Sequence, residues 1–208
     1  MKHIILVAAL AAASVGLAET IKLPAPDKDS GVSVIQALKG RHSERAFCGK
    51  DIPVELLSGV LWAANGFNRP DKRTNATALN LQTITVYVCM KSGAYRYDAK
   101  ANELVKVCDK DLRPAIAAHQ PYAAAAPVSL LITADVSGPA YKDKRSTLTH
   151  YDAGIVSGNI YLYCAANGLV TVCRGSMDRD ALKKALNLGD KIILHLNHPV
   201  GYPLETKK

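Results

Sequence analysis

The sequence lacks the short motifs that mark several large enzyme classes. It contains no GxGxxG, no GxxxxGK[ST], no GxSxG and no HExxH pattern. These patterns serve dinucleotide binding on a Rossmann fold, phosphate binding in P-loop proteins, nucleophilic catalysis in many esterases, and zinc binding in metalloproteases. No motif in the sequence therefore indicates a Rossmann dehydrogenase, a P-loop enzyme, a standard esterase or a zincin.

A pattern for a bound metal is also missing. No two of the five cysteines are spaced as CxxC, so neither a structural zinc site nor a thioredoxin-like motif is indicated. His195 and His198 form an HxxH, but a spacing of three places two residues on opposite faces of a strand. We expect surface or strand-end histidines. For Cys89 and Cys108 two interpretations stay open: a disulfide between neighbouring strands, or two buried reduced thiols.

Basic residues are in excess but are not clustered. The formal net charge is +8, yet no run of five basic residues occurs, and Tyr and Arg are not interleaved along a stripe. We therefore expect no nucleic-acid partner. A modest basic excess suits either a small anionic ligand or an ordinary solvated surface.

The first 18 residues have the organisation of a secretory signal peptide. Lys2 and His3 precede an apolar run over residues 4–15, and small residues follow where a signal peptidase would cut. The run is shorter than the roughly 20 residues that a membrane-spanning helix needs. We expect cleavage before Glu19, export to a periplasm or to the medium, and no stable membrane insertion afterwards.

The rest of the chain predicts one domain of the α+β class. Its length and the 49% of apolar residues fit a single core. We interpret residues 19–30 as a leader and residues 31–208 as the domain. Apolar periodicity predicts helices over residues 32–39, 51–65, 151–167 and 178–188, and strands over residues 82–90, 94–98, 103–108, 127–136, 170–173 and 192–196. This mixed order predicts a central, mainly antiparallel sheet with helices packed over it.

The predicted helix over residues 151–167 has two features that bear on packing. Its candidates for burial are Ile155, Ile160, Leu162 and Ala166. Gly154 and Gly158 lie one turn apart on its surface and permit close approach of another helix, from the same chain or from a second one.

The stretch "LKGRHSERAF" concentrates charge where the first helix ends. Arg41 and Arg45 stand four residues apart with His42 and Ser43 between them. Planar guanidinium groups suit phosphate oxygens, so the stretch could hold an organic phosphate. Taken alone, it is better explained by a solvated helix end whose arginines pair with Glu44 or with water.

The stretch is not alone, because an ordered series of segments resembles the FMN-dependent nitroreductase family. "LKGRHSERAF" is similar to the family signature R-[RH]-S-x-[RK]-x-[FY]. "LLSGVLWAANGFNR" resembles the second helix, "RTNATALNLQTITVYV" the flavin-contacting loop and strand, and "GAYRYDAKANEL" the meander of nitroreductases related to thiazole-forming dehydrogenases. "DAGIVSGNIYLYCAANGLVTVCRGSMDRDALKKALNL" and "HPVGYP" resemble the dimer helix, the flavin-side loop, the next helix and the terminal strand.

This resemblance implies a nitroreductase-like homodimer with FMN at the subunit interface. Such an enzyme works by a ping-pong cycle between NAD(P)H, as co-substrate, and a small-molecule acceptor such as a nitroaromatic or a quinone. The positions that match the family's cofactor contacts are Arg41, His42, Ser43, Arg45, Asn75, Thr77, Asn80, Gln82, Arg174, Gly175 and Lys207. No general acid, general base or metal ligand is implied.

The matched positions carry different implied roles. Arg41 would hold the phosphate, with Lys207 as a second candidate, and His42 and Ser43 would contact phosphate or ribityl groups. Arg45 falls where the family keeps a cation near flavin N1 and O2, and a fixed positive charge stabilises the anionic reduced flavin. The set from Asn75 to Gln82 would line the pyrimidine side, and Arg174 with Gly175 the opposite loop.

The chain departs from the family pattern in ways that leave a second function open. Ala76 and Thr77 replace the usual proline and serine of the flavin loop, and Cys173 takes a position often held by a small residue or proline. Glu44 falls on the variable position of the signature and is expected to face solvent. Export would also separate the protein from cytoplasmic NAD(P)H. The alternative is an exported flavin- or anion-binding protein without NAD(P)H-driven turnover.

Overall fold

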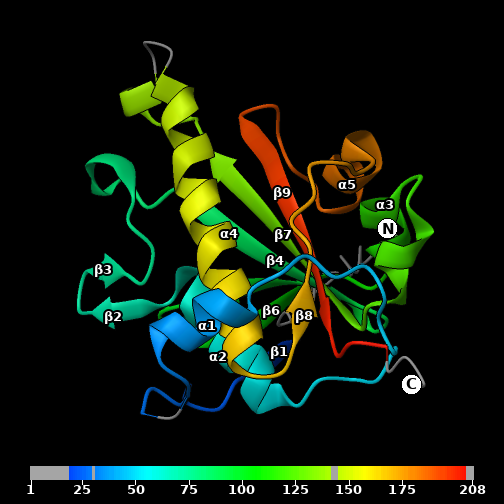
Figure 1. Ribbon diagram of the computed structural model, residues 1–208. Helices are drawn as coiled ribbons and strands as arrows, with labels where there is room; N and C mark the ends of the chain where they lie inside the picture. Colours follow the sequence, from blue (N-terminus) through cyan, green and yellow to red (C-terminus); the bar gives the residue numbers. More distant parts are fainter. Residues whose placement is uncertain (1–18, 30, 142–144, 205–208) are drawn as a thin grey trace, which may run out of the picture.

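The computed structural model describes residues 19–29, 31–141 and 145–204 of the 208-residue chain. Its centre is a seven-stranded antiparallel sheet of strand order β1-β6-β5-β4-β7-β9-β8 (Figure 1). The strands are β1 (Thr20–Lys22), β4 (Ile84–Met90), β5 (Gly93–Asp98), β6 (Glu103–Cys108), β7 (Val128–Asp135), β8 (Val170–Thr171) and β9 (Ile192–Gly201). The predicted α+β class with a mainly antiparallel sheet is confirmed.

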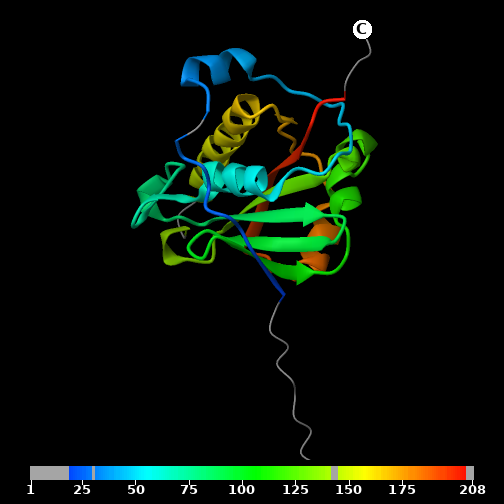
Figure 2. The same cartoon turned by 90° about the horizontal axis from the view of Figure 1, so that it is seen from below.

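Helices cover both faces of this sheet. α2 (Val54–Asn65) and α4 (Leu148–Ala166) pack on one face through a large apolar cluster, and α1 (Val34–Gly40) lies beside α4 (Figures 1 and 2). α3 (Arg113–Ala117) and α5 (Arg179–Ala185) pack on the opposite face. Short 3-10 turns are η1 (Ala78–Asn80), η2 (Pro121–Ala125), η3 (Pro139–Tyr141) and η4 (Arg145–Thr147). Across the described ranges, no helix has the length and apolar character needed to cross a membrane.

α2 forms where the sequence predicts a helix. Pro53 precedes its first turn, and Gly66 ends it by donating its backbone N–H to the carbonyl of Trp62. Its buried apolar residues recur at helical spacing and join the core: Leu57, Val60, Leu61 and Ala64.

Three segments contain structure that the sequence does not reveal. Residues 20–22, within the predicted leader, form the edge strand β1 against β6. The long polar loop after α2 contains a small hairpin of β2 (Phe67–Arg69) and β3 (Lys72–Arg73), followed by η1. α3 has only five residues, too few to display an apolar period.

α4 buries a stripe that differs from the predicted one at one position. Ile160 is buried as expected, and Leu162 and Ala166 are half-buried. Ile155 is 40% exposed, because the buried face of the helix follows Ala153, Val156 and Ile160. The prediction for Ile155 is therefore wrong, and this isoleucine belongs to the outward face.

The five cysteines are free thiols. Cys89 on β4 and Cys108 on β6 both pair with Ala94, which lies on β5 between them. Two strand spacings separate their Cα atoms by about 10 Å, which is more than a disulfide can span. Burial raises the pKa of the Cys89 thiol to about 12. Of the two open interpretations, the structure supports reduced thiols.

His195 and His198 are both buried, so their predicted surface position is wrong. Both also face α4, since the His195 ring contacts His150 and His198 contacts Ser157. The register between β7 and β9 shifts at Thr133, which pairs with Leu194 while its neighbour pairs with Leu196. The extra residue in β9 is His195, and this bulge turns it to the face of His198.

Candidate functional site

The charged stretch after α1 presents its arginines to solvent. α1 begins with a capping box at Ser33 and ends at Arg41, whose extended backbone carries the chain away from the helix. Arg41, His42, Ser43 and Arg45 are all exposed. Neither guanidinium forms an ion pair with any described residue. Two exposed positive charges are thus available to an anion.

Glu44 does not neutralise these arginines. Its Oε1 accepts the backbone N–H groups of Arg45 (2.6 Å) and Ala46 (2.9 Å), and these bonds lower the pKa of the carboxyl group. The residue is half-buried, and its own N–H donates to the carbonyl of Thr171. Glu44, expected to face solvent, thus also fixes the backbone of the loop, and it forms no ion pair with either guanidinium group.

Tyr161 on α4 organises this loop, although sequence reasoning did not select it. Its hydroxyl lies 2.7 Å from Ser43 Oγ and accepts the backbone N–H of Cys173 at 2.8 Å. Arg41 Cζ lies 5.2 Å from the centroid of the Tyr161 ring, within range of a cation–π contact. Half-buried at helical spacing, this tyrosine resembles a core residue in the sequence, and only the fold brings it to Ser43.

A cavity of about 190 Å³ opens beside these residues. Gly40, His42 and Tyr161 line one part of it, and Thr171 and Pro203 line another. His42 Nδ1 lies 2.8 Å from the carbonyl oxygen of Gly40, which fixes the ring at the end of α1. The loop, α4 and β8 therefore enclose a hollow next to the two arginines.

A buried hydrogen-bond network centred on His198 adjoins this cavity through Thr171, which lines it. The Thr171 hydroxyl donates to the carbonyl of Pro199 (2.8 Å), so its oxygen accepts from His198 Nδ1 (3.0 Å). His198 Nε2 is then the acceptor for the Ser157 hydroxyl at 2.8 Å. Burial lowers the pKa of His198 to about 3. The histidine is neutral near pH 7 and ties β8 and β9 to α4.

Acid is expected to destabilise the fold through His198. Its folded-state pKa lies below the ordinary 6.5, so the unfolded chain binds more protons and stability falls as pH falls from about 6.5 towards 3. Between pH 7 and pH 4 this one group should remove about 3 kcal/mol from the free energy of unfolding. Urea unfolding of the wild type and of His198→Gln measures it. The decline should be shallower in the variant, and parallel declines would contradict the assignment.

The second predicted set lies on the loop from Asn75 to Gln82. Gln82 connects it internally: its Oε1 accepts from Arg73 Nε, and its Nε2 donates to Asp71 O and Asn80 Oδ1. The Thr77 hydroxyl oxygen accepts the Gln82 N–H at 3.2 Å. Leu79, Asn80 and Gln82 have positive φ angles of 50° to 56°. Such angles are uncommon outside glycine, and clusters of them mark tightly specified loops.

One hydrogen bond joins this loop to α4, and a buried acceptor in the loop lacks a partner among the described residues. Asp152 Oδ1 accepts the Ala78 N–H at 2.9 Å, and burial raises the pKa of this carboxyl group. Asn75 is 2% exposed, and its Oδ1 has no hydrogen-bond partner among the described residues. Buried acceptors are nearly always satisfied, so this oxygen is a candidate for contact with a bound group.

Arg174 and Gly175 occupy the loop after β8. The Arg174 guanidinium is buried, and its donors are directed to Ile116 O, Asn197 Oδ1, Ala117 O and Gln120 Oε1. One of its five N–H groups remains without an acceptor in the described chain. Gly175 is exposed and accepts from Arg179 Nη2 through its carbonyl. The Arg174 side chain thus anchors α3 to β9, while Gly175 faces outward. Lys207, the last predicted residue, lies outside the described residues.

The structure places the two main sets at different heights along α4. Tyr161 holds the arginine loop and Asp152 holds the loop of Asn75. Nine residues of α-helix separate these two anchors by about 13 Å. Within one chain the predicted residues therefore form two separate groups. The first consists of Arg41, His42, Ser43 and Arg45, and the second of Asn75, Thr77, Asn80 and Gln82.

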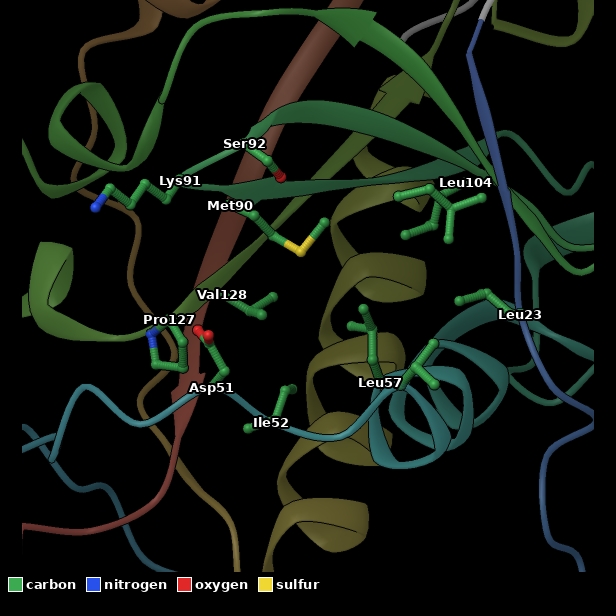
Figure 3. A pocket seen from close by; sticks show the side chains of 12 residues that line it. Leu23, Asp51, Ile52, Leu57, Met90, Lys91, Ser92, Leu104, Pro127 and Val128 are labelled. Carbon is green, nitrogen blue, oxygen red and sulfur yellow. The ribbon is translucent and has the colours of Figure 1, made fainter.

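A larger cavity of about 410 Å³ lies elsewhere, between α2 and the sheet. Its walls are mainly aliphatic, with Leu57, Leu104 and Val128 on different sides and Asp51 and Lys91 near one end (Figure 3). None of the predicted cofactor positions that the structure describes lines it. Among all the residues that the structure describes, no group of three or more His, Cys, Asp or Glu side chains is arranged to hold a metal ion.

Comparison with known proteins identifies the family to which this chain belongs. The model of the nitroreductase family matches residues 38–202. The chain belongs to the nitroreductase family. A protein of Methanocaldococcus jannaschii, provisionally named as a nitroreductase, is 27% identical over 203 residues, which are 91% of this chain and all of the relative.

Solved structures of nitroreductases resemble the fold. One from Ralstonia eutropha, also provisionally named, is 31% identical with a TM-score of 0.80, and the match covers 90% of each chain. Nitroreductase A of Vibrio parahaemolyticus is 19% identical with a TM-score of 0.64, covering 84% of this chain and 70% of its own. At that identity it supports the fold alone. Membership of this family supports an oxidoreductase function for the chain.

Proposed function

We propose that this nitroreductase is an FMN-dependent homodimer that reduces nitroaromatic, quinone or similar acceptors. The observation that carries the proposal is the exposed pair Arg41 and Arg45, which forms no ion pair among the described residues and lies within the part of the chain that matches the family. When bound, FMN would supply the redox chemistry by accepting and passing on a hydride. The similarity of residues 93–104 to nitroreductases related to thiazole-forming dehydrogenases suggests that subgroup.

The residues at the site fit this cofactor. Arg41 can bind the phosphate through charge-assisted hydrogen bonds, and Ser43 is positioned beside it by the Tyr161 hydroxyl. Arg45 adds a fixed positive charge, which favours the anionic reduced state of a flavin. The unsatisfied Asn75 Oδ1 can accept from an N–H of the ring system. These roles require orientation and charge, and no side chain has to act as a general acid or base.

A dimer would unite the two sets that α4 separates within one chain. Tyr151, Gly154, Ile155 and Gly158 share the exposed face of α4, and a Cβ added at either glycine would meet no atom within 4 Å. The predicted close approach of a second helix at these glycines is therefore not made within the described chain. Three exposed apolar residues of α1 add to the outward apolar surface: Val34, Ile35 and Leu38. We propose that a second copy covers this surface.

We also propose that the protein is exported and that NAD(P)H is its electron donor. Residues 1–18, the proposed signal peptide, lie outside the described residues, and the described chain begins at Glu19. An exported enzyme would meet NAD(P)H only where a source supplies it outside the cytoplasm. NAD(P)H remains the proposed donor on family grounds, and the acceptor is a small molecule.

The purified protein is expected to be yellow. Protein isolated from the periplasm or the medium should start at Glu19 by mass and should bind added FMN, giving a flavin absorption band in the visible range. Anaerobic NADH or NADPH should bleach that band, and a nitroaromatic or a quinone should restore it. A colourless protein that takes up no FMN would sink the proposal. Uptake of FMN without reduction by either dinucleotide would favour a binding protein without turnover.

A further inference from the structure

A second polar cavity lies beside the loop of Asn75, and Gln82 is the one residue that it shares with the predicted cofactor set among the described residues. It has a volume of about 210 Å³ and is bordered by the β2–β3 hairpin, the start of β4 and the end of β5. Three cationic residues are among those that line it, Arg73, Arg96 and Lys100, together with one acidic residue, Asp98. The charged residues that border this cavity are therefore predominantly basic.

Arg73 is held rigidly in the wall of the cavity. Its Cζ lies 4.1 Å from the centroid of the Phe67 ring, its Nε donates to Gln82 Oε1 (3.0 Å), and its Nη1 donates to Asn65 O (2.9 Å). No described residue accepts from Nη2. Burial lowers the pKa of this guanidinium, which means that its charge is poorly solvated. A fixed, partly desolvated guanidinium with a free edge suits a planar array of anionic oxygens.

The other charged groups compensate that positive character only in part: the nearby Asp98 carboxylate favours the charged form of Arg73, but burial has the larger effect on its pKa. Arg96 and Lys100 are exposed and form no ion pair with any described residue. Asp98 Oδ1 accepts the backbone N–H groups of Lys100 (3.0 Å) and Ala101 (3.1 Å), so its carboxylate is engaged in the turn after β5. Three cationic residues thus border one cavity, and none of them forms an ion pair within 4 Å with a described carboxylate.

We propose that this cavity binds a phosphate-type oxyanion. Arg73 supplies a preorganised donor, and Arg96 and Lys100 supply mobile charges that can close over the ion. Gln82 bonds to Arg73 on one side and to Asn80 on the other, so occupancy would be felt in the predicted flavin loop. The oxyanion is either free inorganic phosphate or the phosphate group of a reactant such as the 2′-phosphate of NADPH. Only the second source rests on the proposed function.

Calorimetric titration with inorganic phosphate at low ionic strength tests the site. We compare the wild type with the double variant Arg96→Gln/Lys100→Gln, which removes two exposed charges and leaves Arg73 in place. Its phosphate affinity should fall by at least about tenfold, the scale expected for lost charge-assisted hydrogen bonds. Lys183→Gln/Lys184→Gln on α5 removes the same charge away from the cavity and should bind as the wild type does.

A further variant separates this site from the cofactor site. Phosphate binding that is retained in Arg41→Ala and lost in Arg96→Gln/Lys100→Gln supports the cavity. Binding that is lost in Arg41→Ala and retained in the double variant would place the ion at the candidate FMN site and overturn the proposal. Absence of phosphate binding by the wild type would overturn it as well. These titrations do not depend on FMN or on turnover.

Steady-state kinetics then identify the source of the phosphate. If NADPH supplies it, the double variant should raise the KM for NADPH about tenfold and leave the KM for NADH unchanged. If free phosphate is the ligand, the ratio of the two KM values should stay the same while the calorimetric difference persists. Both results retain the oxyanion site. A protein that binds no FMN and shows no turnover would refute the proposed function. The phosphate titrations would still show whether the cavity binds an oxyanion.

Discussion

Arg41→Ala is expected to weaken FMN binding by roughly 1.5 to 3 kcal/mol, the range for a lost hydrogen bond to a charged group. The residue stands at the end of α1, is exposed, and forms no ion pair with a described residue, so its removal leaves no buried charge unpaired. The loss should appear almost wholly in cofactor affinity. Fluorescence titration of the apoprotein with FMN measures it, and urea unfolding of the apoprotein should change little.

A neighbouring lysine provides the control for this variant. Lys39 also lies near the end of α1 and is also exposed, so Lys39→Ala removes one positive charge at nearly the same place. FMN affinity should change by no more than a few tenths of a kcal/mol, as is usual for an exposed charge without a bound partner. Equal losses in both variants would mean that net charge attracts FMN. Unchanged affinity in Arg41→Ala would show that Arg41 does not bind the phosphate.

The fold could be predicted where local signals agree with burial. α2 has a proline at its start, a glycine at its end and an apolar stripe that packs on the sheet, so its position follows from the sequence. The edge strand β1 could not be found in this way. Its three residues, Thr20–Lys22, alternate too briefly to give a period, and only pairing with β6 makes them a strand.

The candidate site shows the same division between local and tertiary information. Arg41 and Ser43 could be selected because a dense motif resembles a family signature. Tyr161 could not, since a tyrosine on an apolar helix gives no sign of a distant partner, yet it bonds to Ser43 across 118 positions of the chain. His195 was misplaced for a related reason: a bulge in β9 reverses the alternation on which the prediction relied.

Gly158→Glu is expected to separate the proposed dimer and to release FMN with it. A Cβ at Gly158 meets no atom within 4 Å, so the glutamate fits the isolated chain, and glutamate favours a helix by about 0.5 to 1 kcal/mol over glycine. In a dimer packed on this face the carboxylate would be buried without a partner. Such burial costs several kcal/mol for each copy, so the dimer dissociation constant should rise by at least about 100-fold. Sedimentation velocity measures it.

Gly189→Glu is the matched control for this experiment. A Cβ at Gly189 also meets open space, and the residue lies in the turn before β9, away from α4. It should leave both the dimer and FMN affinity unchanged. A folded Gly158→Glu monomer that has lost FMN would support the proposal that the loop of Asn75 and the loop of Arg41, which are anchored at separate points along α4, act from different copies. A folded monomer that retains full FMN affinity would contradict this, because one chain would then suffice to hold the cofactor.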